Sequence, residues 1–186
     1  MRLLALVKVR AEIDNRLLMK RIASIGLIGI GLLLFFATGM WIYFNNLITH
    51  PAAAFLPNQV AGLSLSTKMT GIEAIQEFDM LHKNQFPLTS SAIGVYGDQK
   101  ATLWVGGAPF NFMAADMVNA MRDNISAGQS PFTPMDEFKN GRRTVYVLEG
   151  MGQKHYYFQS KNLVIWLAAS PALADQALQQ TLEVYP

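Results

Sequence analysis

The chain has 186 residues, 51% of them hydrophobic, and no cysteine, which excludes disulfides, thiolate metal sites and a lipid-modified cysteine anchor. Its 15 basic and 13 acidic side chains are unevenly spread, because residues 1–21 carry a net charge of +4 and the remainder carries −2. A nucleic-acid-binding domain is therefore disfavoured, since such a domain needs clustered Lys and Arg to displace counterions from phosphates.

Residues 22–44 contain no charged side chain and are mostly strongly apolar. As a helix rising ~1.5 Å per residue, this stretch reaches roughly 34 Å, enough to cross a ~30 Å hydrocarbon core. Lys20 and Arg21 precede it, and Trp41 and Tyr43 lie near its end, as expected of residues at the two membrane interfaces. Because cations are retained on the cytoplasmic side, we expect a single-pass protein of the plasma (inner) membrane with a cytoplasmic N-terminus.

A cleaved signal peptide is the competing interpretation, because Ala52 to Ala54 resemble a small-residue cleavage site. The apolar region of a signal peptide runs about 7–15 residues, and its cleavage site follows closely. Here the uncharged stretch is longer and the alanines lie well beyond Phe44, so an uncleaved anchor is favoured. Met19, directly before the basic pair, is an alternative translation start to Met1.

The segment after the apolar stretch contains Pro51 and Pro57 and has no clear helical or alternating period. It predicts a short, semi-rigid tether, because prolines fix the local backbone. The residues that follow are long enough for one compact core. The expected organisation is a basic cytoplasmic head at 1–21, a transmembrane anchor at 22–44, a tether at 45–62 and an extracytoplasmic domain at 63–186.

Helical and alternating patterns follow one another along this domain. Ile72, Ile75 and Phe78 recur at helical spacing, and residues 97–100 read as a hairpin turn between two β-branched and aromatic runs. The patterns predict helices at 71–83, from Pro109 to about 127 and from Pro171, with Ser170 as the N-cap of the last one. They predict strands at 92–96, 101–106, 143–149, 154–159 and 162–168.

An internal similarity relates residues 95–109 to residues 157–171. Each segment reads as strand, turn, strand, Trp, two small residues and Pro, which predicts two equivalent corners with Trp104 and Trp166 largely buried. The expected fold class is α+β. It combines a single N-terminal transmembrane helix with one small domain, in which three helices pack on one face of a mostly antiparallel sheet of about five strands.

Few residues suggest chemistry. None of the three histidines has a second ligand at metal-binding spacing. Asp79 and His82 are three apart on one expected helix, where a surface hydrogen bond is a commoner outcome than a catalytic dyad. Methionines at 113, 117 and 121 form a thioether ladder, which we interpret as core filler in preference to a Cu(I) site. We therefore expect no metal, no cofactor and no catalytic residue.

Within the expected domain 63–186, residues 128–143 form the longest stretch without a periodic pattern, and long loops in compact domains are often functional. Its aromatic residues are of the type enriched at interface hot spots, and its arginines suit the rim of an interface. The alternative is that the aromatic rings tuck under the loop as a small satellite core. The candidate partner contacts are Phe132, Met135, Phe138, Arg142 and Arg143.

These features favour a non-catalytic, membrane-anchored binding or accessory module, such as one subunit of a larger membrane or envelope complex. Besides the lipid bilayer, the expected partner is a membrane or envelope protein or another copy of the chain. The competing classes are a membrane-tethered, hydrolase-like enzyme and a small-molecule or lipid-binding sensor. An enzyme would show a cleft of converging polar groups, whereas an accessory module would show an exposed apolar patch.

Overall fold

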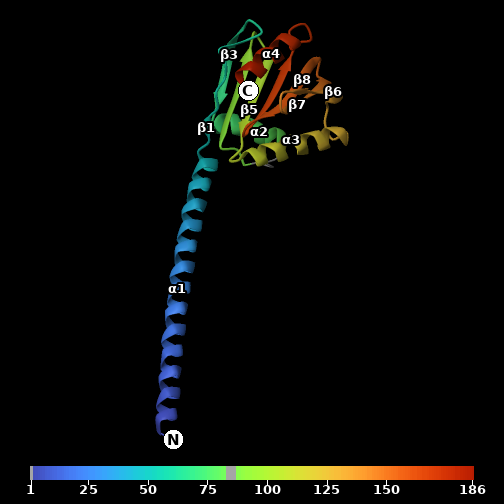
Figure 1. The fold of residues 1–186 in the computed structure, drawn as a ribbon. Helices are drawn as coiled ribbons and strands as arrows, with labels where there is room; N and C mark the ends of the chain where they lie inside the picture. Colours follow the sequence, from blue (N-terminus) through green and yellow to red (C-terminus); the bar gives the residue numbers. More distant parts are fainter. Residues whose placement is uncertain (1, 83–86) are drawn as a thin grey trace. The chain divides into compact units, whose positions relative to one another are not determined.

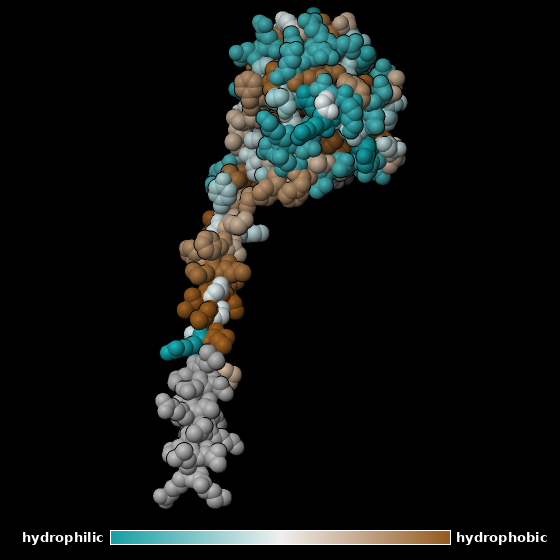
Figure 2. Space-filling view, viewed as in Figure 1, coloured by the Kyte–Doolittle hydropathy of each residue, from teal (hydrophilic) through white to brown (hydrophobic). Residues whose placement is uncertain are grey.

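The computed structural model describes residues 2–82 and 87–186, with side chains for 19–78 and 87–186. The chain divides into two compact units, Met1–Asn45 and Asn46–Pro186. The first unit lies within helix α1 (Arg2–Thr49) (Figure 1). Its stretch Met19–Thr49 contains an 18-residue segment whose mean hydropathy is 2.2, and within the described residues it is the one helix long and apolar enough to cross a membrane. Most of the large apolar side chains of this stretch are exposed (Figure 2).

The second unit is built on a nine-stranded sheet, not the five strands expected. The strand order is β2-β3-β4-β5-β9-β8-β7-β6 with antiparallel neighbours, and β1 pairs in parallel with β4. The strands predicted near 92–96, 101–106, 143–149, 154–159 and 162–168 are confirmed as β4, β5, β7, β8 and β9. The bounds are β1 Ala52–Ala53, β2 Gln59–Val60, β3 Leu63–Thr70, β4 Ser90–Tyr96, β5 Ala101–Gly107, β6 Thr133–Asn140, β7 Arg143–Gly150, β8 Gln153–Ser160 and β9 Leu163–Ala169.

The unforeseen strands come from segments that the sequence suggested were irregular. Within 45–62, the expected tether, lie the last turn of α1 and the strands β1 and β2. Leu56 and Val60 from this segment are buried in the core. Strand β6 occupies half of the expected loop 128–143. Both segments therefore contribute to the folded domain.

The three predicted helices are confirmed as α2 (Ile72–His82), α3 (Asn111–Ser126) and α4 (Ala174–Val184). They do not share one face of the sheet, as the sequence had suggested. Helix α4 packs with Tyr156 and Phe158 in one cluster, whereas α3 packs with Tyr157 and, together with α2, covers the opposite face. Figure 1 shows α4 over the upper part of the strands and α2 and α3 near their lower end.

The apolar stripes of α3 and α4 form these cores as predicted. Met117 is buried, and Met113 and Met121 are partly buried against the same cluster, so all three methionines pack in the core. Helix α4 begins later than expected, at Ala174, because residues 171–173 form a turn instead of its first turn. Ser170 accordingly does not cap α4, whose N-cap residue is Leu173.

The two Trp corners meet at the centre of the sheet. Trp104 of β5 lies directly opposite Trp166 of β9 in the antiparallel register. Both rings are partly buried, not largely buried as predicted. The helices that follow the two corners leave toward opposite faces of the sheet, so the similarity extends to the strands and not to the helix packing.

Candidate functional site

Strand β6 forms one edge of the sheet. Among the described strands it pairs with β7 alone, and most of its side chains are exposed. A bulge between Pro134 and Asp136 interrupts its register. Proline, bulges and charged side chains are features by which proteins limit pairing at an exposed edge, whose free N–H and C=O groups can otherwise bind another strand. The edge of β6 is thus open but carries residues that restrict what can pair with it.

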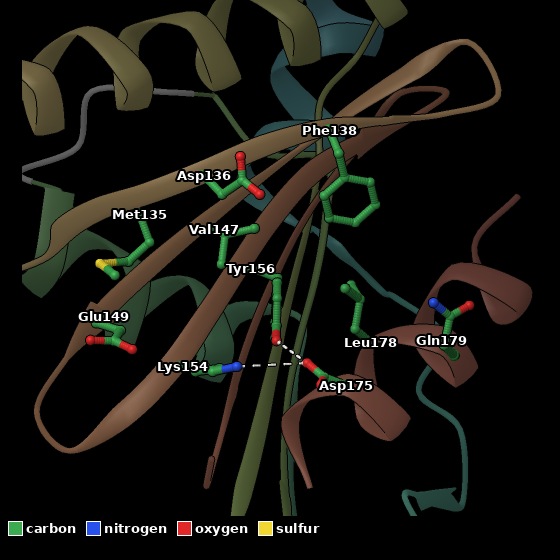
Figure 3. A pocket seen from close by; sticks show the side chains of 10 residues that line it. All are labelled: Met135, Asp136, Phe138, Val147, Glu149, Lys154, Tyr156, Asp175, Leu178 and Gln179. Atoms are coloured by element: carbon green, nitrogen blue, oxygen red, sulfur yellow. Dashed lines mark hydrogen bonds and ion pairs between the residues drawn. The ribbon is translucent and has the colours of Figure 1, made fainter. Parts of the chain in front are cut away.

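A groove of about 460 Å³ lies beside this edge, between the sheet and α4 (Figure 3). Strands β6, β7 and β8 form one side, and the start of α4 forms the other. Apolar side chains from both sides meet polar ones at the rim. The lining residues are Met135, Asp136, Phe138, Val147, Glu149, Lys154, Tyr156, Asp175, Leu178 and Gln179.

Asp175 connects the two sides of the groove. The Tyr156 hydroxyl donates a hydrogen bond of 3.1 Å to Asp175 Oδ1, and Lys154 Nζ lies 3.8 Å from the same oxygen. Figure 3 shows both side chains directed at Asp175. Burial raises the pKa of the Tyr156 hydroxyl, and the Asp175 carboxylate raises it further by accepting its hydrogen bond and by its negative charge. Tyr156 is therefore a neutral donor that fixes α4 to β8.

The rim of the groove is acidic. Asp136, Glu149 and Asp175 are exposed carboxylates, and Lys154 is the one cationic side chain among the lining residues. Lys154 faces Asp175 and is also the cross-strand partner of Glu149, so three carboxylates are opposed by one cation and the rim keeps a net negative charge. An apolar floor with this rim suits a ligand that combines apolar groups with positive charge.

A second hollow, of about 390 Å³, lies on the opposite face of β6 and β7. Arg122 and Ile125 near the end of α3 line it together with Tyr146 and Tyr157. Met135, at the bulge, lines both hollows. The edge of the sheet at β6 is therefore flanked by open space on both faces.

The candidate contacts within 128–143 do not all lie in one place. Met135 and Phe138 line the groove, where Met135 is 55% exposed. Phe132 lies on the other face of the sheet, with its ring centroid 4.5 Å from that of His155 and 5.1 Å from that of Trp166. The alternative interpretation, in which the aromatic rings of this stretch pack as a small satellite core, therefore applies to Phe132.

The two candidate arginines, Arg142 and Arg143, also lie in different environments. Arg142 is exposed at the β6–β7 turn. Arg143 donates hydrogen bonds to the backbone carbonyls of Leu182 and Tyr185 at the end of α4, and its guanidinium lies over the Phe158 ring at 5.1 Å. Burial lowers the pKa of Arg143. Arg143 thus ties β7 to α4.

His155 is buried, as expected for a strand residue beside aromatic rings. Its Nε2 lies 3.0 Å from the Gly150 carbonyl, and the Trp166 indole N–H donates to its Nδ1 at 3.2 Å. Since an indole nitrogen only donates, Nδ1 is the acceptor and Nε2–H donates to Gly150. Burial lowers the pKa of this imidazole, against the opposing effect of the Gly150 carbonyl. Both ring nitrogens are therefore engaged in the fold.

The remaining candidates are placed as follows. Lys20, Arg21, Trp41 and Tyr43 are all exposed on α1. The side chains of Asp79 and His82 lie outside the described residues. Within the described part of the chain, no group of three His, Asp or Glu side chains is arranged to hold a metal ion.

Comparison with protein-family models, with curated proteins and with solved structures gave no significant match. The groove must be interpreted from its own residues. Sequence reasoning missed Lys154, Tyr156 and Asp175, which come from a strand and a helix that looked purely structural. The local signal for Asp175 was its position in the first turn of the last helix, where an acidic side chain is common without any function.

Proposed function

We propose that the protein is a non-catalytic, membrane-anchored binding module whose β6 edge and adjoining groove hold an extended segment of a partner polypeptide. The observation that carries the proposal is the juxtaposition of the exposed β6 edge with the groove between β6–β8 and α4. An extended peptide that adds to a sheet edge gains affinity from main-chain hydrogen bonds and specificity from pockets for its alternate side chains.

The groove favours a polypeptide because its features are spread along a strand. Met135 and Phe138 sit on the edge strand itself, with Leu178 across the groove on α4. A peptide paired with β6 would place every second side chain toward this floor. Asp136 and Glu149 at the rim would attract Lys or Arg in that segment. The partner is accordingly a membrane or envelope protein, or another copy of this chain, with a segment that is both apolar and basic.

The anchor part of the proposal rests on α1 and on the alanines that follow it. Residues 22–44 lie within one continuous, exposed apolar helix. Ala52 and Ala53 pair with Ser90 and Ser91 of β4, and Ala54 is buried. Cleavage after Ala54 would remove β1 from the sheet, whereas retention of α1 as an anchor keeps its pairing with β4.

Photo-crosslinking in cells tests the groove. A photoreactive phenylalanine analogue replaces Met135 in the full chain, and the crosslinked peptide is identified by mass spectrometry. We expect a discrete product that maps to a segment with apolar and basic residues. The matched position is Ser66, exposed on β3 at the other side of the sheet, where we expect no such product.

Charge reversal then tests whether the rim is used. Glu149→Lys should reduce the yield of the crosslinked product from position 135 several-fold, because the new positive charge repels a basic segment. Asp116→Lys makes the same charge change on the exposed side of α3 and should leave the yield unchanged. Equal yields in both variants, or capture at position 66 instead of position 135, would contradict the proposal.

A further inference from the structure

Large apolar side chains are exposed where two helices of the domain begin. Phe112, in the first turn of α3, is 64% exposed, and Ile72, the first residue of α2, is 52% exposed. The Phe112 ring stacks on Phe110, with their centroids 5.5 Å apart. Lys161, in the neighbouring β8–β9 turn, is exposed as well. We call Ile72, Phe110 and Phe112 the apolar rim, and Lys161 lies beside it.

The backbone brings these helix starts to one end of the sheet. Gly71, directly before α2, donates its N–H to the Ser91 carbonyl at the beginning of β4. Thr89, just before β4, donates to the carbonyl of Gly107 at the end of β5, shortly before α3. The β8–β9 turn lies at the same end. The Ala108 N–H donates to the Asn162 carbonyl, and the Asn162 side-chain amide donates to the Ala108 carbonyl. Figure 1 shows β1, α2 and α3 together at this end.

The chain enters the domain at the same end. The N–H of Ala52 donates to the Thr89 carbonyl at 2.9 Å, and a Cβ added at Gly71 would lie 3.0 Å from the Pro51 carbonyl oxygen. Phe44 closes the uncharged apolar stretch only about eight residues earlier, a separation that spans less than ~30 Å even when fully extended. The apolar rim and the point where the chain enters the domain therefore lie at the same end of the sheet.

We infer that the apolar rim inserts into the headgroup region of the bilayer that holds α1. This inference rests on the anchor of the proposed function. Clustered exposed apolar side chains mark interaction surfaces, and those beside a membrane span gain free energy by entering the interface. For its driving force the inference rests on the apolar side chains alone, because the exposed cation Lys161 is offset by the exposed carboxylate of Glu73, next to Ile72. Insertion would restrict the orientation of the domain relative to the bilayer.

Depth-dependent fluorescence quenching tests the inference on the full chain. Because the chain has no cysteine, single cysteines at positions 112, 100 and 41 can each carry an environment-sensitive fluorophore in nanodiscs that hold one copy. Lipids with a nitroxide near the headgroup supply the quencher. Phe112→Cys should be tolerated in folding, since the ring is mostly exposed. Lys100, exposed at the opposite end of β5, is the control outside the membrane.

We expect the label at position 112 to lose most of its fluorescence, as the label at position 41 does, and the label at position 100 to keep it. Quenching at position 41 without quenching at position 112 would overturn the insertion of the apolar rim and would leave the anchor assignment intact. Absence of quenching at 41 would overturn the anchor, and the rim inference would fall with it. Because each nanodisc holds one copy, a rim that is instead covered by a second copy would give the unquenched result at 112.

Discussion

At the scale of single residues, His155 couples stability to pH. Its imidazole is 3% exposed, and its Nδ1 accepts the Trp166 N–H. A protonated ring would direct a second N–H at that donor. The folded state therefore keeps His155 neutral, and its pKa falls below the ordinary value of 6.5. Above pH 6.5 His155 is neutral in both the folded and the unfolded chain, so its full contribution to stability is present there.

As the pH falls through 6.5, the unfolded chain binds a proton at this residue and the folded chain does not. We predict that the free energy of unfolding decreases between pH 7 and pH 5.5, with a slope of at most ~1.4 kcal/mol per pH unit from this one group. Urea unfolding of the full chain in detergent, followed by tryptophan fluorescence, measures it. His155→Gln should flatten the dependence; a slope in this variant equal to that of the unsubstituted chain would refute the assignment.

At the scale of elements, Arg143 joins β7 to the end of α4. Its guanidinium bonds the Leu182 carbonyl at 2.9 Å, together with that of Tyr185, and these groups have no partner within the helix. A cation also complements the negative end of the helix dipole. Arg143→Ala should lower the free energy of unfolding by about 2 kcal/mol, the usual effect of losing hydrogen bonds from a charged group.

The neighbouring arginine provides the control. Arg142 has the same side chain and is exposed at the turn, so Arg142→Ala should change stability by less than ~0.5 kcal/mol. Urea unfolding curves of the two variants, measured side by side, give the comparison. Similar losses in both would mean that the contact with α4 does not stabilise the domain.

The elements that the sequence predicted are those with a regular pattern. Helix α4 repeats buried residues at helical spacing, and β7, β8 and β9 are apolar runs separated by short turns. Strand β6 could not be recognised in this way, because an exposed edge strand buries neither face and Thr133 to Lys139 show no alternation. Strand β3 begins with alternating Leu63 and Leu65, a signal that was present but interrupted by the bulge after Leu65.

At the scale of the whole molecule, the groove depends on contacts between distant parts of the chain. Met135 and Phe138 could be nominated because they are apolar residues in a polar stretch. Asp175 could not, because its role follows from α4 crossing the sheet beside Tyr156. The face that each helix covers was likewise unpredictable, since two similar Trp corners lead α3 and α4 to opposite sides.

The most direct test of the central claim asks whether the groove lies outside the cytoplasm on a chain that keeps its anchor. Met135→Cys in the otherwise cysteine-free full chain is treated in intact cells with a membrane-impermeant maleimide that shifts electrophoretic mobility. We predict labelling of a full-length species in the membrane fraction, with Arg16→Cys labelled only after lysis. Labelling of position 135 only after lysis, or its recovery on a shortened species free of the membrane, would contradict a membrane-anchored module with an extracytoplasmic binding groove.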